Sequence, residues 1–326
     1  METDKEYDAG VYVIKNLEGL ITKFAIFGVL LYFLIIVLAD ASHVLEALRN
    51  FNLSIVLLSL VLVFIGYIIR MRRWTYLLNL LKIRSKMNRL IFFSGLSMTI
   101  TPGKIGEFLK CFLLKRAEGV DKSKTAPAVV MERLGDLIGF FMLLLFASPF
   151  FIYRPVQSIT AVSLLILAIF IFLAVLTTEW FTKKIESITL KITGKKLKKT
   201  KQFQRSMKRL FNKQVIVYTS IMGSVSWFLE GIVLWLIISG FGFRVPFIQV
   251  ISIFSLCSLL SGISMIPGGF GVVEGSLYFF LSYLKIPLPV AASIIIIFRL
   301  CTLWFAVILG TLSLHLFDRR VKKLKN

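Results

Sequence analysis

The sequence has 326 residues, 57% of them hydrophobic and 13% aromatic, and a formal net charge of +22. Its mean hydropathy of +0.83 exceeds what a soluble domain of this length needs, which excludes a soluble globular protein. The positive charge does not indicate nucleic acid as a partner, because the basic segments lack the folds and aromatic platforms that bind it; in so apolar a chain it indicates which side of a membrane each loop occupies.

The segment before the first apolar stretch, 1–19, is acidic and lacks a basic region and a small-residue cleavage site, so we expect no removable signal peptide there. A membrane-spanning helix needs about 20 mostly apolar residues. One polytopic membrane domain is predicted over 1–326, with a first half at about 20–176, a basic loop at 183–213 and a second half at about 215–316. Six segments are predicted to span the membrane: 20–39, 53–70, 129–151, 158–176, 215–240 and 290–316.

Two further apolar segments, 90–114 and 250–285, are each interrupted by Pro-Gly, which a continuous helix tolerates poorly. Cytoplasmic loops of membrane proteins carry the excess of Lys and Arg. Most of the 39 basic residues fall in four segments: 70–89, 104–124, 183–213 and 319–325. A full crossing by 90–114 would put neighbouring basic segments on opposite sides. We therefore expect both broken segments to be re-entrant hairpins, with both termini cytoplasmic in a cell membrane.

The two hairpins share a motif, Pro-Gly-x-apolar-Gly, which begins at Pro102 in the first and at Pro267 in the second. The spacing from Gly106 to Arg133 is nearly equal to the spacing from Gly271 to Arg299. The charge bias places the two halves upside down relative to each other. The predicted fold class is thus an all-α integral membrane protein with about six transmembrane helices and two re-entrant, Pro-Gly-broken hairpins in an inverted repeat, as in secondary transporters. Chance recurrence of these short motifs remains the alternative.

Seven ionisable residues fall in apolar segments, where each costs at least ~2.5 kcal/mol and usually has a partner or a task. They are Glu107, Glu132, Arg133, Asp136, Glu230, Glu274 and Arg299. The two arginines are predicted to donate to a phosphate of the substrate, and the five carboxylates to act in coupling or as ion-pair partners. Tip glycines are predicted to let backbone N–H groups approach the same anion: Gly103, Gly106, Gly268, Gly269 and Gly271.

A structural role for these charges is the alternative. Arg133 and Asp136 are three residues apart, share a helix face and could neutralise each other. Arg299 has no acidic neighbour in sequence, so its partner is expected to be Glu230 or Glu274. Ion pairs of this kind would fix helix packing without binding a substrate.

The cysteines and histidines indicate no catalytic or metal chemistry. Cys111, Cys257 and Cys301 are widely spaced in apolar segments, and His43 and His315 lie near span ends. We therefore expect no zinc site, no disulfide framework and no cofactor. The predicted external loops are short and carry no Asp-x-Asp cluster, so the chain is not expected to be an enzyme.

The basic loop at 183–213 contains a single acidic residue, Glu186. Its charges could attract anionic headgroups of the cytoplasmic leaflet and bring lipid to the site. They could equally serve only to orient the protein in the membrane.

Three stretches, TPGKIGEFLKCFLLKRAEGVDKSKTAPAVVMERLGDLIGFF, SMIPGGFGVVEGSLYFF and FRLCTLWFAVILG, resemble the transmembrane domain of lysylphosphatidylglycerol synthase and its stand-alone, flippase-like relatives. The resemblance covers about 20 to 316. It implies a translocator of an anionic or polyprenyl-linked lipid. The aminoacyl-transferase domain of the synthase does not follow the last predicted span, so lysyl transfer is not expected. The family pattern carries onto Gly103, Gly106, Glu107, Glu132, Arg133, Asp136, Pro267, Gly268, Gly269, Gly271, Glu274 and Arg299.

Three functions remain open. The first is a lipid flippase or transporter that moves an anionic phospholipid or a polyprenyl-phosphate-linked lipid between leaflets. The second is a non-transporting membrane partner of a glycosyltransferase or lipid synthase, in which hairpins and charges act as scaffold. The third, a membrane enzyme acting on lipid-linked sugars, is disfavoured by the short loops.

Overall fold

A computed structural model describes residues 19, 22–24, 26–101, 106–147 and 198–325, and all regular structure in these residues is helical. The predicted span at 158–176, the end of the one at 129–151, the first part of the basic loop (183–197) and Gly103 lie outside the described residues. The elements are a helix Thr22–Leu38, α2 (Ala41–Arg49), α3 (Leu53–Leu80), α4 (Asn88–Leu96), η1 (Ser97–Ile100), α5 (Leu109–Glu118), α6 (Lys122–Ala147), α9 (Lys198–Leu210), α10 (Lys213–Gly240), α11 (Phe247–Ser264), η4 (Pro267–Gly269), α12 (Val272–Tyr283), α13 (Leu288–Arg299), η5 (Leu300–Trp304) and α14 (Phe305–Lys325).

Four helices in the described part of the chain are long and apolar enough to cross a membrane. They are α3, α10, α11 and the continuous helix Leu288–Lys323. The helix Thr22–Leu38 is bent by 105° against α2, and the two count as a fifth candidate if they form one span. The predicted span at 129–151 corresponds to α6, whose apolar part carries three ionisable residues. The chain is therefore a multi-pass helical membrane protein, whereas the number six remains a prediction.

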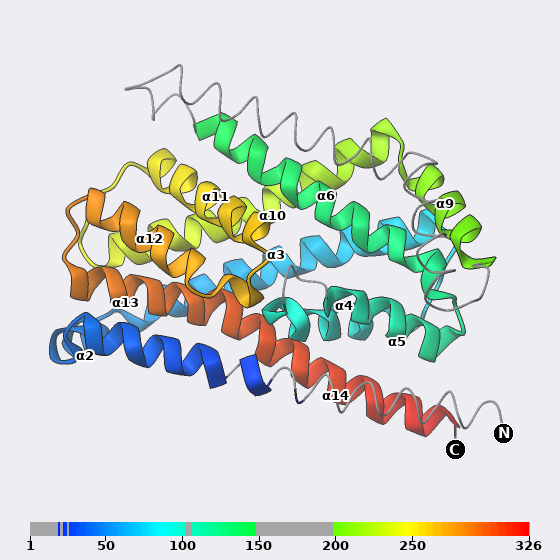
Figure 1. The fold of residues 1–326 in the computed structure, drawn as a ribbon, viewed down its shortest axis with the longest axis horizontal. Helices are drawn as coiled ribbons and strands as arrows, with labels where there is room; N and C mark the ends of the chain where they lie inside the picture. Colours follow the sequence, from blue (N-terminus) through cyan, green and yellow to red (C-terminus); the bar gives the residue numbers. More distant parts are fainter. Residues whose placement is uncertain (1–18, 20–21, 25, 102–105, 148–197, 326) are drawn as a thin grey trace, which may run out of the picture.

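Two helical hairpins open at opposite ends of the molecule and point their tips toward its middle (Figure 1). The first consists of α4, η1 and α5, and the second of α11, η4 and α12. The tip elements η1 and η4 contact each other, and a Cβ added to Gly268 would lie 3.4 Å from Ile100 Cγ1. The predicted meeting of the two broken segments is thus present in the fold. Their re-entry into a bilayer stays a prediction.

Glycine is required at the second tip by its backbone conformation. Gly268, Gly269 and Gly271 have φ angles of 59°, 65° and 81°. This left-handed region is costly for residues with a Cβ atom. A Cβ on Gly269 would also lie 2.2 Å from Ser261 Oγ of α11. The tip therefore reverses the chain in a space that larger residues do not fit.

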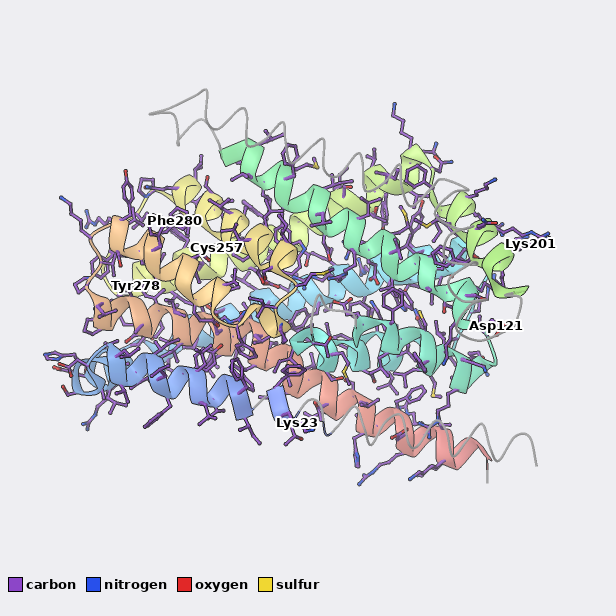
Figure 2. All side chains as sticks on the ribbon, in the orientation of Figure 1. Lys23, Asp121, Lys201, Cys257, Tyr278 and Phe280 are labelled. Carbon is purple, nitrogen blue, oxygen red and sulfur yellow. The ribbon has the colours of Figure 1, made fainter. Side chains whose placement is uncertain are left out.

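Basic residues gather at one end of the described structure. Ser123 donates to Gln202 at 2.8 Å, which ties the start of α6 to α9, and Arg116 forms an ion pair with Asp318, which ties α5 to the end of α14. Figure 2 shows Lys201 of α9 and Asp121 at this end, with Tyr278 of α12 toward the opposite one. The described parts of the basic segments that were predicted to share one side therefore lie together.

The first tip rests against α14 at Gly310. A Cβ on Gly310 would lie 2.1 Å from the backbone nitrogen of Ser97, so even a methyl group must displace the tip. We expect Gly310→Ala to lower the free energy of unfolding by about 1–3 kcal/mol. Thermal unfolding of the purified protein in detergent measures the change. Gly275→Ala is the matched control, because a Cβ on this α12 glycine meets nothing within 4 Å; equal stability of the two variants would contradict the close packing.

Candidate functional site

Charged side chains that are buried or, for Arg133, partly buried form two groups. We call the first the central network; it joins α3, the return of the first tip, α5, α6 and α10. It consists of Arg70, Arg73, Glu107, Lys110, Glu132, Arg133, Asp136 and Glu230. The second, which we call the tip pair, is Arg299 with Glu274 of the second hairpin.

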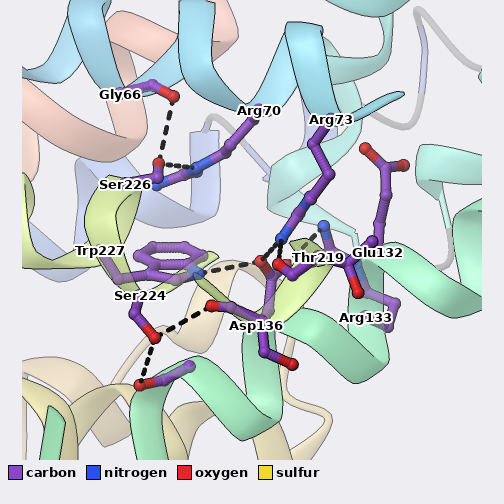
Figure 3. A network of polar contacts seen from close by, with 12 residues as sticks. Gly66, Arg70, Arg73, Glu132, Arg133, Asp136, Thr219, Ser224, Ser226 and Trp227 are labelled. Atoms are coloured by element: carbon purple, nitrogen blue, oxygen red, sulfur yellow. Dashed lines mark hydrogen bonds and ion pairs between the residues drawn. The ribbon is translucent and has the colours of Figure 1, made fainter. Parts of the chain in front are cut away.

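Asp136 is the centre of the network (Figure 3). One carboxylate oxygen accepts from Arg73 Nη1 at 2.8 Å and from Trp227 Nε1 at 3.0 Å, while the other lies 2.9 Å from Arg133 Nη2. The predicted pairing of Arg133 with Asp136 is therefore present. Because the side chain of Arg73 is 0% exposed, Asp136 provides the charge compensation that lets this guanidinium stay buried.

Glu107, at the return of the first tip, connects that tip to α6. Its carboxylate accepts from Arg133 Nη2 at 2.9 Å and from Lys110 Nζ at 3.3 Å. The Lys110 ammonium also donates to Glu132 at 2.5 Å and lies 4.6 Å from the centre of the Trp74 ring. The two carboxylates therefore share one ammonium, which holds α5 against α6.

Glu230 of α10 pairs with Arg70 of α3 and not with Arg299. Arg70 Nε also donates to Ser226 Oγ at 2.6 Å, and its guanidinium stacks 3.7 Å from the centre of the Trp227 ring. The sequence alone left Glu230 and Glu274 as alternative partners of Arg299. The fold separates them, because α3 packs along α10 and provides its own arginine to Glu230.

In the tip pair, Arg299 Nε lies 2.8 Å from Glu274 Oε1, and Tyr32 Oη bridges the two residues at 3.2 and 3.1 Å. Arg299 Nη2 also donates to the carbonyl of Gly268 at 2.5 Å. The other oxygen of Glu274 accepts from Gly271 N at 2.8 Å and so caps α12. Arg299 thus holds the second tip closed through one carboxylate and one carbonyl.

The same contact occurs in each half of the chain. The carboxylate of the first tip, Glu107, pairs with Arg133 of α6, the helix after the first hairpin. The carboxylate of the second tip, Glu274, pairs with Arg299 of α13, the helix after the second hairpin. The two pairs have nearly the same separation along the chain. A π-helical turn, η5, begins directly after Arg299, a distortion that is frequent at functional sites.

Charges in the central network balance, since four basic side chains face four carboxylates. An incoming anion must therefore replace a carboxylate or arrive with a proton. Some donor capacity remains: Arg133 Nε, and Nε and Nη2 of Arg73, are buried without a hydrogen-bond partner in the described structure. The Arg133 side chain is 27% exposed, against 0% for Arg73, so Arg133 is the more accessible of the two.

Tip glycines use their N–H groups within the protein in this structure. Gly106 N donates to Thr101 Oγ1, Gly269 N to the Ile266 carbonyl and Gly271 N to Glu274. Their predicted contact with a substrate anion stays a prediction, and it would require these bonds to exchange.

Sequence reasoning missed four residues of the site. Arg70 and Arg73 were assigned to a cytoplasmic segment, but α3 continues to Leu80, so both lie in a helix and are buried. Lys110 was likewise counted among cytoplasmic charges, although it follows Glu107 by three residues, a spacing that indicates an ion pair on one helix face. Nothing in the sequence around Tyr32 indicated its contacts with Arg299 and Glu274, which are distant along the chain. Arg133 and Arg299 are therefore not the only basic residues in the interior.

No group of three or more His, Cys, Asp or Glu residues in the described ranges is arranged to hold a metal ion. The three cysteines are buried and separate.

The sequence is similar to those of known membrane proteins, in most cases over nearly its whole length. A family model described as the lysylphosphatidylglycerol synthase TM region matches residues 20–310. A UPF0104 membrane protein of Methanocaldococcus jannaschii is 26% identical over 307 residues, which cover 86% of this chain and 90% of that protein. Another from Methanothermobacter thermautotrophicus is 23% identical over 323 residues, 91% of this chain and 96% of that protein. A phosphatidylglycerol lysyltransferase of Staphylococcus xylosus is 40% identical over 58 residues, 18% of this chain and 7% of that protein.

Proposed function

Because the chain belongs to the family of the lysylphosphatidylglycerol synthase transmembrane region, we propose that it moves an anionic phospholipid or a polyprenyl-phosphate-linked lipid between the leaflets of the cell membrane. The observation that carries the proposal is the meeting of two broken hairpins from opposite ends, each with a tip glutamate paired to the arginine of the next helix. Broken helices that meet inside an inverted repeat are the usual substrate sites of secondary transporters.

The two arginines act as fixed positive charges. A guanidinium does not release its proton at physiological pH and can donate to a phosphate through two parallel bonds. A lipid phosphate that reaches Arg133 or Arg299 would replace Glu107 or Glu274 as the partner. Each glutamate belongs to a hairpin tip, so its release would free that tip to move. Exchange of partners therefore couples headgroup binding to opening of one hairpin.

A second function, a scaffold for a glycosyltransferase or lipid synthase, is favoured by a different observation. The central network is balanced in charge and joins five parts of the fold, as ion pairs that only fix helix packing would do. Under this function no anion enters the network, and the chain is not an enzyme in either case.

Translocation in reconstituted vesicles separates the two functions. Fluorescent phosphatidylglycerol is placed in both leaflets of vesicles with and without the protein, and an impermeant reductant quenches the outer-leaflet label. We expect faster and more complete quenching with the protein, and more for phosphatidylglycerol than for phosphatidylcholine. Quenching equal to that of protein-free vesicles would reject transport of this lipid class; repetition with a polyprenyl phosphate tests the other candidate.

The end at which basic residues gather is expected to face the cytoplasm, together with both termini, by the positive-inside rule. At the opposite end (Figure 1), basic residues occur at the end of α2 and in the turns between α10 and α11 and between α12 and α13: Arg49, Arg244 and Lys285. We expect Lys201→Cys to react with an impermeant thiol reagent from the cytoplasmic side only, and Lys285→Cys from the outside only. The native cysteines are buried and contribute little background. Labelling of both positions from one side would refute the predicted arrangement of the halves.

A further inference from the structure

The basic end of the molecule contains a cavity of about 750 Å³ between α3, the segment before α4, and α14. Its volume lies in the range of small-ligand pockets, roughly 300–1,000 Å³. Four basic side chains line it, one or two from each wall, and no carboxylate does: Arg72, Lys86, Arg89 and Arg320. The cavity thus concentrates positive charge in a concave surface.

Within the described residues no carboxylate compensates this charge, in contrast to the interior of the protein. The eight charges of the central network are balanced in ion pairs, whereas none of the four basic residues of the cavity pairs with a carboxylate of the described residues. All four are exposed. An anion that enters this cavity therefore gains attraction without displacing a carboxylate of the described residues.

Uncharged groups of the cavity are fixed by hydrogen bonds across its wall. Trp74 Nε1 donates to Asn88 Oδ1 at 2.9 Å, and Asn88 Nδ2 donates to Thr75 Oγ1 at 2.8 Å, so α4 is joined to α3. The ring of Tyr76 packs 4.3 Å from the ring of Tyr218, centre to centre. These amide and hydroxyl groups are engaged within the protein and hold the cavity wall in place beside the basic residues.

Apolar side chains complete the lining. Met71, Met87 and Leu90 provide a hydrophobic part that lies next to the charged part. A lipid at the membrane boundary also has a charged part beside an apolar part, since its phosphate is next to its glycerol and acyl chains. Free inorganic phosphate has no apolar group that could contact these side chains.

We propose that this cavity binds the phosphate of an anionic lipid headgroup on the basic side of the molecule, outside the tip pair and the central network. The inference rests on the proposed function only for the lipid's later passage to the tips; binding itself does not depend on transport. The basic residues collect the headgroup, and the paired arginines of the interior receive it afterwards.

Binding is tested in nanodiscs of phosphatidylcholine with a minority of phosphatidylglycerol, by the lipid retained on the purified protein in native mass spectrometry. The double variant Arg89→Gln, Arg320→Gln is expected to bind phosphatidylglycerol about 30-fold more weakly, since each basic residue near the surface contributes about fivefold. The control is Arg244→Gln, Lys285→Gln, which removes two exposed basic residues at the opposite end. Unchanged retention in the first double variant, or equal loss in the control, overturns the proposal.

A second arm distinguishes the source of the phosphate. Inorganic phosphate is added to the wild type in the same nanodiscs at a concentration far above that of the lipid. Retention of phosphatidylglycerol that resists this competition supports a headgroup site; complete displacement would assign the cavity to free phosphate and overturn the lipid proposal. Translocation is measured separately, so a wild type that binds through Arg89 and Arg320 without translocating lipid rejects the proposed function but not the cavity.

Discussion

Replacement of Arg299 by glutamine is expected to abolish lipid translocation while the protein still inserts and purifies as a folded species. The side chain lies in the interior, 7% exposed, and is the only basic partner of Glu274 among the described residues. Glutamine keeps hydrogen-bonding capacity toward the Gly268 carbonyl but has no positive charge for a lipid phosphate. Vesicle translocation, measured beside size-exclusion and thermal-unfolding profiles, provides the two readouts.

Two further variants separate binding of substrate from packing. Arg299→Lys keeps the charge but lacks the planar fork, and we expect little activity from it. The double variant Glu274→Gln, Arg299→Gln removes both charges, so it should restore any stability lost in Arg299→Gln without restoring transport. Full translocation by Arg299→Gln, or recovery of translocation in the double variant, would make Arg299 a structural ion-pair residue and remove it from the site.

Asp136→Ala is expected to cause the largest loss of stability of any single substitution in the central network. Arg73 would lose its only carboxylate partner among the described residues while its side chain stays fully buried, and Trp227 would lose the acceptor of its indole N–H. Removing one member of a buried ion pair costs about 3–5 kcal/mol, because the remaining charge is left uncompensated. The fraction of monodisperse protein and its unfolding temperature in detergent measure the effect.

Two other variants of the protein serve as controls for Asp136→Ala. Asp40→Ala removes an aspartate whose side chain is 57% exposed, and whose pKa is lowered to about 2 by hydrogen bonds from Ser42 and His43. We expect a far smaller change there, because water solvates the charges that remain. The double variant Arg73→Met, Asp136→Leu should recover much of the stability, since apolar residues can replace a buried ion pair. An Asp136→Ala protein as stable as the wild type, or a double variant no more stable than Asp136→Ala, would contradict the compensation of Arg73 by Asp136.

Prediction from sequence succeeded where a signal is local. Both apolar segments that contain Pro-Gly are broken: the helical structure of the first stops at Ile100 before α5 begins, and the second turns at glycines with left-handed φ angles. Arg133 contacts Asp136 because three residues separate them on one helix face. Clustering of the basic segments at one end also followed from charge alone. The resemblance to the family was confirmed by the match over residues 20–310.

Prediction from sequence failed where the partner of a charged residue, or the end of a helix, depends on how the helices pack. The span predicted at 53–70 ends well before Leu80, the last residue of α3, because counting charges assigned Arg70 and Arg73 to a loop. Carboxylates of α10 and α6 compensate both arginines in the interior. The choice between Glu230 and Glu274 for Arg299 could not be made for the same reason.

Composition, charge bias and the repeated Pro-Gly motif therefore determined on their own that this is a multi-pass helical membrane protein with two broken segments. These properties depend on single residues or on neighbours along one helix, so the chain carries them before it packs. Only the tertiary structure decided which carboxylate meets each arginine, that Tyr32 bridges Arg299 and Glu274, and that Gly310 leaves room for the first tip. The members of each such contact lie far apart along the chain, and an ion pair or a close approach between them exists only when the helices that carry them are packed together.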